Sequence, residues 1–86
     1  MLKMTPKEQV YEKITKEREY QDSKWGSVEH HPHSIPEWIM IMEAELAEAK
    51  HAWLKKGEYE AKLEMIQVIA VGIAALEQHG PADRVL

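Results

Sequence analysis

The chain has 86 residues, a formal net charge of −4 and a pI near 5.7, and it contains no cysteine. A single small domain, residues 1–86, is expected, and a chain of this length buries only about 60 to 65% of its unfolded surface, so a lone monomer would be marginal. The acidic balance argues against a nucleic-acid polymer as the main partner, and the lack of cysteine excludes a disulfide framework and a thiolate zinc site. The start lacks the apolar region of a signal peptide and the longest apolar run is too short for a bilayer, so a cytoplasmic protein without a membrane partner is expected.

The first predicted helix covers residues 6–23. Thr5 and Glu8 have the spacing of a capping box, and Pro6 occupies the first helical position. Its apolar stripe is thin, with Val10 and Ile14 set among charged residues. Such a helix is expected to cover one side of a larger bundle.

The second predicted helix covers residues 35–54, after a connector rich in turn residues. Ser34 and Glu37 repeat the capping spacing. Two neighbouring rows run along this helix: one is apolar and includes Trp53, and the other begins at Trp38 and carries acidic residues. Both tryptophans are predicted to lie in the core.

The third predicted helix covers residues 58–78, between the glycine stop at Gly57 and Gly80. From 65 to 76 it is apolar nearly all round, and a helix of this kind must be surrounded on every side. The two other helices of one chain can hardly surround it on every side. The sequence therefore predicts an all-α fold in which three-helix protomers associate, as a homodimer or homotetramer, around a four-helix-bundle core.

A group of polar residues interrupts the two apolar helices. Glu45 and Glu48 are three residues apart on one helix, and Glu64 and Gln67 are three apart on the next, so each pair shares a face. The short connection makes the helices antiparallel neighbours, and three converging carboxylates would repel one another unless a hard divalent cation such as Mg²⁺ stood between them. The alternative is that these glutamates belong to an ordinary solvated helix face.

Three segments of the chain resemble a known family. Residues 44–48 read AELAE, residues 64–67 read EMIQ, and residues 17–26 read EREYQDSKWG. With the apolar stretch that follows position 67, they resemble the MazG-like, all-α nucleoside triphosphate pyrophosphohydrolases, in particular small proteins of phage and bacterial genomes. The resemblance extends over about residues 10–79.

The resemblance implies an activity and a metal site. The expected reaction is hydrolysis of a nucleoside triphosphate to the monophosphate and pyrophosphate, a nucleotide-pool housekeeping function. Mg²⁺, or Mn²⁺ in its place, would be held by Glu45, Glu48, Glu64 and Gln67, and Glu48 would orient or deprotonate the attacking water. The family usually has acidic residues where this chain has Ala44 and Gln67. The alternative is a catalytically silent relative that serves as a nucleotide-binding or protein-interaction module.

The substrate would need cationic and aromatic partners. The candidates for the phosphates are Arg18, Lys24, Lys50 and Lys55, and Trp25 is the candidate for stacking on the base. For each cation the alternative is a solvated surface charge. For Trp25 the alternative is that the indole closes the first helix onto the bundle.

The connector contains a cluster of His30, His31 and His33. Imidazole groups suit zinc, nickel or copper, which offers a rival metal site. Pro32 interrupts the cluster, and no helical spacing brings two of the rings together.

Overall fold

The computed structural model describes residues 3–85, and within them the chain forms three α-helices and no strand. These are α1 (Pro6–Trp25), α2 (Ile35–Lys56) and α3 (Glu58–His79). Each helix begins where the sequence predicts and ends one or two residues later. The all-α class is confirmed, and no described helix combines the length and hydropathy that a membrane crossing requires.

The helix boundaries follow from their caps. The Thr5 hydroxyl accepts from the Glu8 amide at 3.1 Å, and the Thr5 amide donates to the Glu8 carboxylate at 2.9 Å. Ser34 and Glu37 form the same reciprocal pair at the start of α2. At the other end of α2, Gly57 has a φ of +102°, a backbone conformation that side chains disfavour, and this one residue joins α2 to α3.

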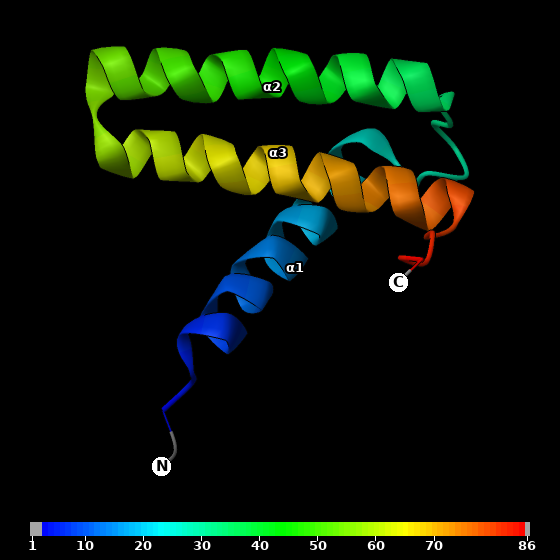
Figure 1. Ribbon diagram of the computed structural model, residues 1–86, viewed down its shortest axis with the longest axis horizontal. Coiled ribbons are helices and arrows are strands. Elements are labelled where there is room, and N and C mark those ends of the chain that lie inside the picture. Colours follow the sequence, from blue (N-terminus) through cyan, green and yellow to red (C-terminus); the bar gives the residue numbers. More distant parts are fainter. Residues whose placement is uncertain (1–2, 86) are drawn as a thin grey trace.

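Figure 1 shows α2 and α3 as an antiparallel hairpin, with α1 lying obliquely across one side of α3. α3 is the helix against which both others pack, and α1 does not pack directly on α2 in the described part of the chain. The expectation that the first helix covers one side of the bundle is therefore met.

The core between α2 and α3 is narrow. Trp38 packs there against Val71, Ala74 and Ala75. Small residues on α3 let the helices approach closely, so that a Cβ at Gly72 would lie only 3.0 Å from the Met42 Cε. The buried residues of α2 and α3 are mostly alanines.

The structure corrects the predicted orientation of α2. The face that packs on α3 contains Trp38, Ala49 and Ala52, which are buried, so it combines the row that begins at Trp38 with Ala49 of the apolar row. Trp53 is 57% exposed, so the prediction of a core position is wrong for this residue within the chain. The sequence pattern showed two adjacent rows, and the side that faces α3 is decided by packing.

The connector between α1 and α2 is fastened to the end of α3 by Gln78. The Gln78 side-chain amide accepts from the His33 backbone N–H at 3.0 Å and donates to the His33 carbonyl at 2.8 Å. The same amide oxygen accepts from the Trp38 indole at 2.8 Å. One side chain thus fixes both the connector and the buried indole.

Candidate functional site

Three carboxylates of the α2–α3 hairpin converge. Glu45 and Glu48 come from α2 and Glu64 from α3, and one oxygen of each lies within 4.8 Å of the others. The spacing of three residues puts the α2 pair on one face, and the one-residue connection at Gly57 brings α3 alongside in the opposite direction. The convergence expected from the sequence is present in the fold.

The convergence leaves charge without compensation. Burial, then the charges of Glu48, Glu64 and Glu17, raises the pKa of Glu45 above its usual value of 4.5. Among the described residues, the buried Oε2 atoms of Glu45 and Glu64 accept no hydrogen bond. Buried carboxylate oxygens without a partner are costly, and hard cations bind such oxygens. These residues therefore fit a divalent cation.

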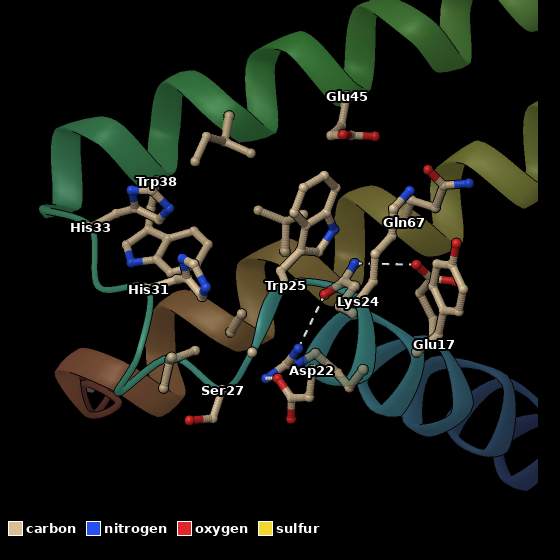
Figure 2. Close-up of a pocket in the computed structure, with 18 residues that line it drawn as sticks. Glu17, Asp22, Lys24, Trp25, Ser27, His31, His33, Trp38, Glu45 and Gln67 are labelled. Atoms are coloured by element: carbon tan, nitrogen blue, oxygen red, sulfur yellow. Dashed lines mark hydrogen bonds and ion pairs between the residues drawn. The ribbon is translucent and has the colours of Figure 1, made fainter.

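A pocket of about 450 Å³ adjoins the carboxylates. Glu45 and Gln67 line it at one end, and His33 and Trp38 line it at the other, as Figure 2 shows. Trp25, at the end of α1, lies between these two ends. The volume of the pocket falls in the range of pockets that enclose small molecules. The wall of the pocket is part aromatic and part polar, as in many ligand sites.

Gln67 and Ala44, the two positions at which acidic residues were expected from the resemblance, lie in different surroundings. Gln67 borders the pocket together with Glu45, so an uncharged amide lies next to the carboxylates. Ala44 is exposed on α2. An amide oxygen can bind a metal ion but brings no charge.

Arg18, a predicted phosphate ligand, is one of the least exposed polar residues. Its guanidinium contacts Glu77 of α3 at 2.6 and 2.8 Å, Asp22 at 3.0 Å and Gln21 at 3.2 Å. The side chain borders the pocket, but its charge is shared with two carboxylates. This arrangement attaches α1 to α3.

Lys24 and Trp25 border the pocket, as their predicted role requires. The Lys24 ammonium lies 4.8 Å from the centre of the Trp25 ring and 5.7 Å from that of Tyr20. In the part of the chain that the structure describes, no carboxylate forms an ion pair with Lys24. Of the four predicted phosphate ligands, Lys24 is therefore the one that borders the pocket without a carboxylate partner among the described residues.

The other two predicted phosphate ligands lie outside this pocket. Lys50 borders a different, apolar depression together with Trp53 and Met65. Lys55 is in the last turn of α2, far along the helix from Glu45. The structure therefore does not bring Lys50 and Lys55 together with the pocket residues.

The histidine cluster is divided between different partners. His30 Nδ1 lies 2.9 Å from the Ser27 hydroxyl, whereas His33 packs edge-on against Trp38 with ring centroids 4.7 Å apart. His31 lies over Gly26 and borders the pocket. The three rings do not form a metal site among the described residues, where the acidic trio is the metal-compatible group found.

Sequence reasoning missed three polar residues near the site: Glu17, Gln21 and Gln78. Glu17 and Gln21 border the pocket from α1, and Gln78 holds the pocket wall at His33. Glu17 and Gln21 belong to the segment that carried the family resemblance, which was the available signal. Nothing in the pattern of α3 distinguished Gln78 from an exposed helix residue.

Comparison of the chain with protein-family models, with curated proteins and with solved structures found no match.

Proposed function

We propose that this protein is a Mg²⁺-dependent, MazG-like nucleoside triphosphate pyrophosphohydrolase, which releases a nucleoside monophosphate and pyrophosphate. The observation that carries the proposal is the meeting of Glu45, Glu48 and Glu64 beside a pocket that also presents Lys24 and aromatic rings. A cation site and an unpaired ammonium would neutralise the phosphates of a triphosphate, and an aromatic ring would stack on its base.

The roles of the residues follow from their positions. Glu45, Glu48 and Glu64 would hold Mg²⁺ or Mn²⁺, which when bound neutralises phosphate oxygens and acidifies water. Glu48 is the exposed member of the trio, and it would orient the attacking water and accept its proton. Lys24 would bind phosphate oxygens, and Trp25 would stack on the base.

The protomer would associate through an exposed apolar face. On α2 and α3, Leu46, Trp53 and Met65 border one apolar depression on the side away from the pocket. Ile69 and Ile73 continue this row along α3 and are 42% and 36% exposed. Water contact with such a surface is unfavourable, which supports a second copy packed there and a four-helix core.

The replacement of a charged ligand by Gln67 favours a second candidate, a catalytically silent relative that binds nucleotides. In that case the pocket residues would retain the ligand, but the carboxylates would position no reactive water.

Pyrophosphate release tests the proposal. The wild-type protein would be incubated with standard and damaged nucleoside triphosphates in Mg²⁺ or Mn²⁺, beside Glu48→Gln and the matched surface variant Glu19→Gln. We expect turnover of at least one nucleotide, loss of about 100-fold or more in Glu48→Gln, and wild-type rates in Glu19→Gln. Absence of turnover with every nucleotide, or equal rates in the two variants, would overturn the enzymatic proposal. Nucleotide binding without turnover would support the silent relative.

A further inference from the structure

Glu17 of α1 lies in the pocket that adjoins the three carboxylates of the hairpin. It lines the same pocket as Glu45 and Gln67, and its side chain is partly buried. Figure 2 shows all three at the end of the pocket away from His33 and Trp38. Glu17 is not a member of the 4.8 Å group, so its carboxylate lies farther from the trio than the three carboxylates lie from one another.

The carboxylate of Glu17 is held by a chain of hydrogen bonds. Glu77 binds the Arg18 guanidinium, whose Nη1 donates to the Gln21 side-chain oxygen at 3.2 Å. The Gln21 amide nitrogen then points at Glu17 and donates to its Oε2 at 3.3 Å. Because the arginine accepts nothing, it fixes which end of the Gln21 amide faces Glu17. One Glu17 oxygen takes part in this bond, and the other is left for a ligand.

The like charges of Glu17 and the trio require an explanation. Glu17 is close enough to Glu45 to contribute to the raised pKa of that carboxyl group. The backbones of α1 and α2 do not approach each other closely in the described residues, so α1 is held beside α2 through α3. The Oε2 atoms of Glu45 and Glu64 are buried without hydrogen bonds. A cation between Glu17 and the trio would satisfy all of these groups together.

We propose that Glu17 is the fourth carboxylate of the cation site, supplied by α1 in place of the charge that is missing at Gln67. This inference rests on the proposed function, because it adds a ligand to the same site. It also makes cation binding a link between α1 and the α2–α3 hairpin, since Glu17 and the trio lie on different elements.

Mn²⁺ binding without nucleotide tests the assignment. Dissociation constants would be measured by calorimetry and by the electron paramagnetic resonance of free Mn²⁺, for the wild type, Glu17→Gln, Glu17→Asp and Glu19→Gln. We expect Glu17→Gln to weaken binding about tenfold or more, and Glu19→Gln, two residues away on the exposed side, to leave it unchanged. Glu17→Asp keeps the charge but shortens its reach, so it should bind nearly as weakly as Glu17→Gln.

The link between the helices gives a second readout. Amide hydrogen exchange in α1 should slow when Mn²⁺ is added to the wild type, and this protection should be lost in Glu17→Gln although the apo variant remains folded. Full recovery of affinity in Glu17→Asp would show that Glu17 acts only as a nearby charge and would overturn the proposal, as would unchanged binding in Glu17→Gln.

Failure of the proposed function is distinguishable from failure of this inference. If the wild type binds no Mn²⁺, or if the Glu48→Gln variant binds Mn²⁺ as tightly as the wild type does, the cation site itself is refuted. If binding depends on Glu48 but not on Glu17, the cation site stands and only the assignment of Glu17 is wrong.

Discussion

Arg18 of α1 and Glu77 of α3 form a forked ion pair, in which Nε and Nη2 of the arginine lie 2.8 and 2.6 Å from the same carboxylate oxygen. The arginine side chain is 10% exposed and the glutamate 42%, so the pair is partly shielded from water. It joins two helices that are 59 residues apart in the chain at this point. It is therefore the main polar attachment of α1 to the hairpin.

Glu77→Gln should destabilise the fold by about 1 to 3 kcal/mol, because it leaves a nearly buried guanidinium short of a charge partner. Urea unfolding followed by circular dichroism would measure the loss. Glu12→Gln is the matched control, since Glu12 is 42% exposed like Glu77 but pairs at 3.1 Å with Lys16, which is 64% exposed. That change should cost less than about 0.5 kcal/mol. Equal losses in the two variants would contradict the structural role given to Glu77.

The stability of the metal-free protein should depend on pH through Glu45. Its pKa is raised in the folded state, so the folded protein binds this proton more tightly than the unfolded chain does. The stabilising contribution is fully present below the usual value of 4.5 and is lost as the pH rises through the raised folded-state value. Above that range the charged carboxylate is a destabilising group.

Glu45→Gln isolates this effect, because the amide imitates the protonated acid. In a chelating buffer, the variant should melt at the same temperature as the wild type near pH 4 and at a higher temperature near pH 7.5. Saturating Mg²⁺ should reverse the order at neutral pH, because it stabilises the wild type alone. If the difference in melting temperature between the wild type and Glu45→Gln does not change with pH, burial and the neighbouring charges do not raise the pKa of Glu45.

Gln67→Asp should restore a charged ligand and tighten Mn²⁺ binding on the order of tenfold. Gln67→Asn is the control, because it shortens the side chain equally but adds no charge. Calorimetric titration of both variants separates the two effects. If both bind Mn²⁺ as the wild type does and only the melting temperature falls, Gln67 has a structural role and the site is not a weakened version of the four-acid pattern.

Ile69→Asp should break the proposed association of protomers. The wild type is expected at twice 10.0 kDa or more in sedimentation or light scattering, and the variant near 10.0 kDa with its helical signal retained. Val10→Asp serves as the control, because Val10 is 51% exposed on α1, outside the apolar face. A stable, monodisperse wild-type monomer would refute the four-helix core.

The helices could be predicted closely because their ends carry local signals. The capping pairs at Thr5 and Ser34 and the glycine at Gly57 act within a few residues, so the boundaries need no knowledge of the fold. The meeting of Glu45 with Glu64 was predictable for a similar reason, since a short connection leaves antiparallel packing as the simple outcome.

What could not be predicted depends on contacts between distant segments. Helical spacing showed that α2 has an apolar row and a neighbouring row that carries acidic residues, but not that Trp38, rather than Trp53, would face α3. The attachment of Arg18 to Glu77 and of the connector to Gln78 joins residues that no periodic pattern relates. Because of these contacts, Lys24 borders the pocket and the charge of Arg18 is paired with carboxylates.

The single residue between α2 and α3 gives the loop an unusual intolerance to changes in length. Gly57 lies nine residues after Glu48 and seven before Glu64. The length of the turn therefore fixes where Glu64 lies relative to Glu45 and Glu48. One inserted residue at the start of α3 would turn the following side chains by about 100° and advance them by about 1.5 Å relative to α2. Surface loops usually accept insertions freely, but here a lengthened turn would separate Glu64 from its partners even if both helices formed normally.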